Sequence, residues 1–82
     1  MVGYTSLDEI LERMTKDCRI CGERMVIVRI YVKKRDGDTL HLEPLLKCLK
    51  CNRYDRGYTV RVSERKWGSA LRKFLGDIIR GL

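Results

Sequence analysis

The sequence lacks the features that carry a protein into or across a membrane. No stretch approaches the roughly 18 consecutive apolar residues of a membrane span. The first residues contain neither the basic region nor the apolar region of a secretory signal. We therefore expect a cytoplasmic protein. In that reducing compartment, paired cysteines favour metal binding over disulfides.

Catalytic side chains are also scarce. The chain has a single histidine, His41, and no Ser-His-Asp set, Walker loop or other catalytic motif. Glutamine is missing and asparagine occurs once, a depletion of labile amides that is typical of thermophilic proteins. We expect a protein that is not an enzyme.

Chain length limits how the fold can be held together. Eighty-two residues make one domain, residues 1–82, with a thin core. A chain this short often needs a disulfide, a metal or a partner as a further source of stability. The four cysteines are therefore the first feature to explain: Cys18, Cys21, Cys48 and Cys51.

Two segments have the apolar spacing of amphipathic helices. Residues 7–16 follow Ser6, which opens a capping box. Residues 64–80 follow a second capping serine, Ser63, and carry a wide apolar stripe that begins at Trp67. We expect the longer helix to pack, through this tryptophan, on apolar residues of a sheet: Val26, Val28, Leu42 and Leu46.

Three segments alternate between apolar and polar residues, as strands do. Residues 25–33 and 39–47 form a hairpin, and residues 57–62 form a third strand. Pro44 has no N–H to donate, so its nitrogen must face away from a ladder partner. The sequence predicts an α+β fold: a three-stranded antiparallel ribbon with an N-terminal helix and a longer C-terminal amphipathic helix.

The apolar pattern also predicts the register of the hairpin. Directly paired residues share a face of the sheet. Pairing the even-numbered apolar residues of both strands therefore requires a loop of odd length. We expect a three-residue loop at 36–38, which pairs Val32 with Leu42 and Val28 with Leu46. A two-residue Asp-Gly turn would instead place a polar residue opposite Val32.

The cysteines form two Cys-x-x-Cys motifs, at residues 18–21 and 48–51. Two intervening residues let both sulfurs reach one ion from a tight turn. The residue after the second cysteine often needs a positive φ, which Gly22 adopts without steric cost and Asn52 tolerates well. A hairpin between the motifs would leave and return at one place, so the motifs meet there. We expect one structural zinc ion, Zn2+, bound by all four cysteines.

Other uses of the cysteines fit the sequence less well. Two disulfides would need oxidising conditions, and a thioredoxin-like redox site usually has one such motif before a helix. An iron–sulfur cluster or a rubredoxin-type iron is chemically compatible with four thiolates. His41 lies in the middle of a predicted strand, so we expect a surface residue and not a ligand.

Residues 18–62, the ribbon core, resemble the zinc-ribbon family, in which two such cysteine turns flank a hairpin and a third strand follows. The resemblance implies a fold and a metal, and a setting in transcription, replication or the ribosome. The spacing is similar to that of the elongation factor S-type ribbons, which help an RNA polymerase cleave RNA through adjacent acidic residues at the hairpin tip. Here the tip has Asp36 and Asp38, separated by Gly37, without an adjacent acidic pair.

The net charge of +7 suggests a polyanionic partner, most simply DNA or RNA. Cations and tyrosines follow one another in the ribbon, where arginine can pair with phosphate and tyrosine can stack on unpaired bases. A plain solvated face is the alternative for any one of these residues. The predicted nucleic-acid-binding residues are Arg29, Lys33, Lys34, Arg35, Arg53, Tyr54, Arg56 and Arg61.

The apolar stripe of the terminal helix runs to the last residue. Most of it should cover the ribbon, but Ile78, Ile79 and Leu82 can overhang and dock a protein partner or a second copy of the chain. Two functions therefore follow from the sequence. The first is a non-enzymatic zinc-binding protein that binds nucleic acid, in transcription or translation. The second is a protein–protein adaptor or a small subunit of a polymerase or ribosome-like assembly.

Overall fold

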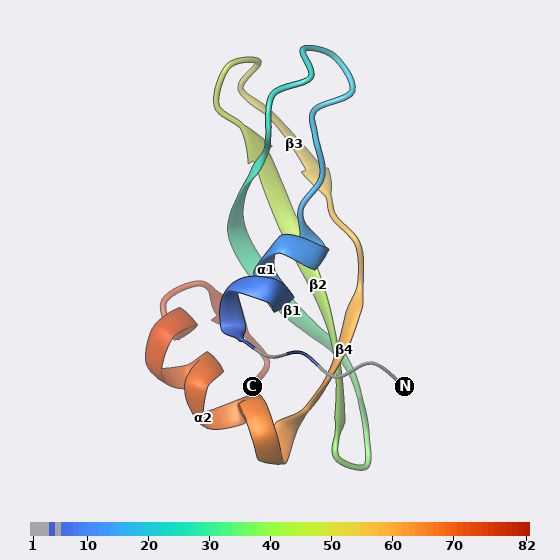
Figure 1. Cartoon of the computed structure of the whole chain (residues 1–82), viewed down its shortest axis with the longest axis vertical. Coiled ribbons are helices and arrows are strands. Elements are labelled where there is room, and N and C mark those ends of the chain that lie inside the picture. The colour runs from blue at the N-terminus through green and yellow to red at the C-terminus, as the bar shows by residue number, and fades with distance from the viewer. Residues whose placement is uncertain (1–3, 5) are drawn as a thin grey trace.

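The computed structural model describes Tyr4 and residues 6–82. These residues form an α+β fold with two helices and five strands, joined in one sheet of mixed parallel and antiparallel pairing. The molecule is elongated, with a long axis of 38 Å. Two loops lie at one end of this axis and the hairpin turn lies at the other (Figure 1). No described helix is both long enough and apolar enough to cross a membrane.

The strand β2 is at the centre of the sheet. The elements in chain order are α1 (Leu7–Met14), β1 (Val26–Asp36), β2 (Thr39–Cys48), β3 (Arg53–Arg56), β4 (Val60–Ser63), α2 (Glu64–Leu75) and β5 (Ile79–Arg80). β1 runs antiparallel to β2 along its whole length, so β3 and β4 both pair with the opposite edge of β2. β5 adds a short parallel pairing to the outer edge of β1.

The third strand was predicted at residues 57–62, but β4 begins only at Val60 and an unpredicted strand, β3, precedes it; Pro44 explains the break between the two. β3 pairs with residues 45–48 and β4 with residues 39–42, so the gap between them falls opposite Pro44. The carbonyl of Pro44 accepts a hydrogen bond from the N–H of Gly57 in that gap. N–H and C=O of one residue point to the same edge in an antiparallel ladder. The proline nitrogen therefore faces the interruption, as its missing donor requires.

The hairpin reaches the expected register by an unexpected route. Asp36 pairs with Thr39, so the loop has two residues and not three, with Gly37 at a φ of 61°. A loop of even length, without any other change, would pair the apolar residues of one strand with the polar residues of the other. A bulge at Lys33 inserts one unpaired residue and restores the parity, so Val32 does pair with Leu42.

A second bulge, at Val28, overturns the rest of the predicted register. Leu46 pairs with Ile27 instead of Val28. The extra residue moves Ile27 to the covered face of the sheet, and it leaves Val26 exposed. The expectation that α2 packs on Val26 and Val28 is therefore wrong, because alternation cannot show where a bulge reverses it.

Both helices cover the same face of the sheet. α1 begins after Ser6, whose hydroxyl accepts the N–H of Glu9 as expected, and it contributes Ile10 and Met14 to the core. α2 contributes Leu71, with Trp67 half-buried beside it. The strands supply the other core residues: Ile30, Leu40, Leu42, Val60, Val62 and Ile79.

The C-terminal helix is shorter than the predicted 64–80, since α2 ends at Leu75. Gly76 has poor helix propensity. Beyond it the chain turns so that the carbonyl of Ile78 accepts the N–H of Ile30 in β1. Ile79 is then buried as part of β5. Pairing with a free sheet edge thus replaces further helical turns, although the apolar spacing fits either structure.

The tip of the hairpin is bound to the start of α2. The N–H of Arg65 donates to the Asp38 carboxylate at 2.8 Å, and the Ser63 hydroxyl donates to the same carboxylate. The N–H of Glu64 donates to the Asp38 carbonyl at 2.7 Å. The hydrogen bond from the Ser63 hydroxyl lowers the pKa of the Asp38 carboxyl most, and the one from the Arg65 N–H lowers it further. Asp38 therefore serves as a second cap for the positive end of this helix.

Replacing Gly57 with alanine should destabilise the fold. A Cβ at Gly57 would overlap the Met14 carbonyl oxygen and approach the Pro44 Cγ to 2.7 Å. We expect a loss of about 1–3 kcal/mol in the free energy of unfolding, as for an overpacked core. The matched control is Gly68→Ala in α2, which should gain about 0.5–1 kcal/mol through helix propensity. Denaturant unfolding measures both, and a neutral Gly57→Ala would contradict this packing.

Replacing Asp38 with asparagine should lower the melting temperature, whereas Asp36→Asn, the same charge change in the same turn, should alter it little. The lowered pKa of Asp38 means that its contribution is complete above the unfolded value of 3.8 and is lost only as the pH falls through the lowered value. The difference in melting temperature between the Asp38→Asn and Asp36→Asn variants should therefore stay constant from about pH 8 to pH 5. Calorimetry tests this, and equal effects of both substitutions would rule out the cap.

Candidate metal centre

The two cysteine turns have the same backbone geometry. In the first, the N–H of Gly22 donates to the Cys18 carbonyl at 2.8 Å, and in the second, the N–H of Asn52 donates to the Cys48 carbonyl at 2.7 Å. Gly22 has a φ of 78° and Asn52 a φ of 59°. Asn52 is the one non-glycine residue with positive φ in the described part of the chain. The prediction that both positions are left-handed is confirmed.

Strand pairing brings the two turns together. The first turn is enclosed by the short bridge between Asp17 and Arg24, just before the start of β1, and the second follows the end of β2. The β1–β2 ladder reaches Val26 and Lys47, next to both turns. β1 thus begins just after one cysteine turn and β2 ends at the other, and the two turns form one end of the molecule (Figure 1).

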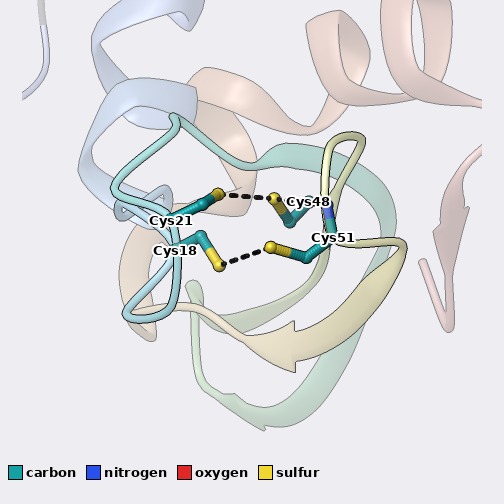
Figure 2. A group of neighbouring side chains, drawn as sticks. All are labelled: Cys18, Cys21, Cys48 and Cys51. Atoms are coloured by element: carbon teal, nitrogen blue, oxygen red, sulfur yellow. Dashed lines mark hydrogen bonds between the residues drawn. The ribbon is translucent and has the colours of Figure 1, made fainter.

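The four sulfurs point toward one another (Figure 2). Their Sγ atoms all lie within 4.8 Å of one another. The Cys21–Cys48 pair is separated by 3.4 Å and the Cys18–Cys51 pair by 4.0 Å. Tetrahedral zinc with bonds of about 2.3 Å would place sulfurs about 3.8 Å apart. All four cysteines are free thiols, so the cluster is a possible four-sulfur metal site.

The site is sheltered from water on one side. Cys18 and Cys48 are buried, whereas Cys21 and Cys51 are half-buried. Met25, Leu46 and Ile27 pack against the sulfurs in a small apolar cluster, separate from the core under the helices. The N–H of Cys51 donates to the Cys48 sulfur at 3.4 Å. Such donors and apolar neighbours orient thiolates and protect their bonds to a metal.

The crowded thiols differ in acidity. The backbone N–H groups of Cys21 and Ile20 lower the pKa of Cys18 to about 7. The hydrogen bond with Cys21, followed by burial, raises the pKa of Cys51 to about 12. Four negative charges so close together would repel one another strongly. A bound cation removes that repulsion, so the cluster suits a metal better than free thiolates.

His41 takes no part in this site. It lies in β2 opposite Arg61 of β4, near the hairpin end of the molecule. At the usual rise per strand residue, its position is about 23 Å along β2 from Cys48. Among the described residues, the candidate metal site therefore offers sulfur atoms only.

Most predicted nucleic-acid-binding residues lie on the sheet face opposite the helices, which we call the open face. Pairing places residues on this face in rows, such as Arg29, Leu45 and Arg56 across three strands. From the predicted set, it holds Arg29, Lys33, Lys34, Tyr54, Arg56 and Arg61. Arg35 and Arg53 are on the other face. Arg35 contacts Glu64 of α2 at 2.6 Å, and Arg53 lies beside the first cysteine turn.

Other residues of the open face were not predicted. Lys47 pairs with Tyr54, with its ammonium 5.4 Å from the ring centre, and Arg80 of β5 lies beside Tyr31. The position of Lys47 and Arg80 on this face follows from the strand register, and the strand β5 that carries Arg80 was not predicted. The two cysteine turns also expose Ile20 and Leu49, each with more than half of its surface accessible. In the sequence, the signal for these exposed side chains was an apolar residue between the two cysteines of each motif.

The residues expected to dock a partner pack within the protein itself. Ile79 is buried, and Ile78 and Leu82 pack against the same core. They do not overhang the sheet, because the chain after α2 folds back onto β1.

Comparison of the chain with protein-family models, curated proteins and solved structures finds no match.

Removing the metal should unfold the cysteine end of the protein. The apolar cluster there is small, and structural metal binding contributes directly to folding free energy. A Cys48→Ser variant should lose stoichiometric metal and melt at a lower temperature, whereas His41→Asn should keep one metal per chain. Elemental analysis and circular dichroism with and without a chelator measure this. A chain that stays fully folded without metal would contradict the assignment.

Proposed function

We propose that this protein is a zinc-ribbon protein that binds DNA or RNA through the open face of its sheet and has no catalytic activity of its own. The zinc assignment is supported by the donor set. Four thiolates in a tetrahedral arrangement form the closed shell of structural zinc. Iron is the chemical competitor for such a site. The ion, when bound, supplies a positive charge that fixes both turns at the end of the ribbon.

The ribbon assignment rests on the order of the elements. Two cysteine turns flank the β1–β2 hairpin, and β3 and β4 follow one another along a single edge of β2. Residues 53–63 thus occupy the place of a third strand that is interrupted in the middle. This arrangement is the one that the zinc-ribbon resemblance implies, with two covering helices and β5 added to it.

Uncompensated positive charge on the open face is the observation that supports nucleic-acid binding. The carboxylates among the residues that strand pairing and the hollow place on this face are Glu43 and, at the hairpin end, Asp36. The cations there are Arg29, Lys33, Lys34, Lys47, Arg56, Arg61 and Arg80. Phosphates would displace counterions from such a surface and bind it.

Ion pairing sharpens this difference between the two faces. The pairs Lys16–Asp55, Arg35–Glu64 and Arg72–Glu64 lie on the side of the helices. On the open face of the described chain, Glu43 pairs with Arg56 at 3.0 Å and no other ion pair forms. α1 adds the acidic residues Asp8 and Glu9 to the covered side. The net charge of the protein is therefore concentrated where no helix lies.

Two features argue against catalysis at the sites that the sequence suggested. Four sulfur ligands leave a zinc ion no open position for a substrate. At the hairpin tip, Asp38 holds the start of α2 and is not available as a second acidic group beside Asp36. The tip therefore acts as a structural joint in this proposal.

Binding to nucleic acid should be strong at low salt and weaken steeply between about 50 and 200 mM salt, because counterions are released. An Arg29→Ala/Arg61→Ala variant should bind at least about tenfold more weakly at low salt, and its logarithmic salt slope should fall by about two. The matched control, Arg13→Ala/Lys73→Ala, has the same net charge but changes the helices. Fluorescence anisotropy with labelled oligonucleotides measures both. Equal losses in the two variants would exclude the open face as the binding surface.

A further inference from the structure

A hollow in the open face has a size and a lining that suit one small aromatic group. It lies across β1, β2 and β3 and has a volume of about 390 Å3. That volume is within the range of small-ligand pockets. Its lining residues are Tyr31, Lys33, Glu43, Pro44, Leu45 and Arg56.

The lining separates into an apolar part and a polar part. Tyr31 lies directly opposite Glu43 in the ladder and has 39% of its surface exposed, so its ring is accessible for stacking. Leu45 adds apolar surface from β2, whereas the Pro44 side chain is fully buried. A planar aromatic ligand would therefore find the tyrosine ring beside it and the Leu45 side chain below it.

Glu43 gives the hollow its selectivity. Its side chain is only 19% exposed, and the Arg56 guanidinium holds its Oε1 atom at 3.0 Å. An ionised carboxylate only accepts hydrogen bonds, and each oxygen can accept more than one. The pairing with Arg56 therefore fixes the orientation of Glu43 and leaves acceptor capacity for a ligand with neighbouring N–H groups.

Guanine is the nucleobase that matches this acceptor. Its Watson–Crick edge has two adjacent donors, N1–H and the 2-amino group, which can both bond to one carboxylate. Adenine and cytosine each place an acceptor nitrogen beside their single amino group, and uracil flanks its N3–H with two carbonyl oxygens. Only guanine presents two donors without an acceptor that would face the Glu43 oxygens.

We propose that the hollow binds one unpaired guanine of a single strand, with the ring stacked on Tyr31 and the Watson–Crick edge bonded to Glu43. This inference rests on the proposed nucleic-acid binding and names its ligand. The base must be unpaired, because a duplex already uses the edge that Glu43 reads. Lys33 at the rim and Arg29 in the neighbouring row are placed for the adjoining phosphates.

The test compares short single strands that differ in one base. The zinc-loaded protein is titrated with labelled uridine-rich RNA and thymidine-rich DNA octamers that carry a central guanine, inosine, adenine or cytosine. We expect guanine to bind about tenfold more tightly than adenine or cytosine. Inosine, which lacks the 2-amino group, should fall between them. The RNA and DNA series show which sugar the surface prefers.

Two variants assign the effect to the hollow. Glu43→Gln should remove the preference for guanine but keep salt-dependent binding, because glutamine replaces one acceptor oxygen with a donor. Glu12→Gln on α1 makes the same charge change on the covered side and should keep the preference. Tyr31→Leu should weaken binding to every octamer by about tenfold, as loss of one stacked base does. Zinc content and circular dichroism confirm that each variant is folded.

The outcomes separate this inference from the proposed function. Salt-dependent binding that is equal for all four bases, or equal for duplex and single strand, would overturn the guanine pocket and leave nucleic-acid binding in place. A guanine preference that survives in Glu43→Gln would also overturn it. Absence of salt-dependent binding to any octamer or duplex would contradict both proposals.

Discussion

Four sulfur atoms from two distant turns can enclose one ion only if the chain between the turns returns to its starting point. The antiparallel ladder of β1 and β2 meets this condition, since it ends beside both turns. Each turn also needs a left-handed residue after its second cysteine, and Gly22 and Asn52 supply it. The metal end has only a small apolar cluster of its own, so its order depends on these sulfurs. The helices, which pack over the other end, do not replace them.

The opposite end of the ribbon is held by hydrogen bonds instead. Asp38 at the hairpin tip caps α2, and α2 in turn leads the chain back to β1 as β5. The ribbon is thus fixed at both ends by different means, a cluster of thiols and a helix cap. Both helices cover one face between these ends, and the other face keeps its cations exposed. This one-sided cover leaves a cationic surface, to which we propose that a polyanion binds.

Much of this could be predicted from the sequence, because the relevant signals are local. The clustering of the four cysteines, the two left-handed positions, both serine caps and the pairing of Val32 with Leu42 were predicted from spacing and residue type. The bulges at Val28 and Lys33 were not, since an extra residue in one strand leaves no mark in an alternating pattern. The end of α2 was also missed, because Ile78 and Ile79 fit a helical stripe as well as a strand. The open face could be assembled only once the register was known.

X-ray absorption at the metal edge of the purified protein tests the central claim most directly, because it reports the ion and its ligands together. We predict one zinc per chain with four sulfur neighbours at about 2.3 Å and no nitrogen or oxygen ligand. A zinc shell with fewer than four sulfurs, a different resident metal, or cysteines found as disulfides would contradict it.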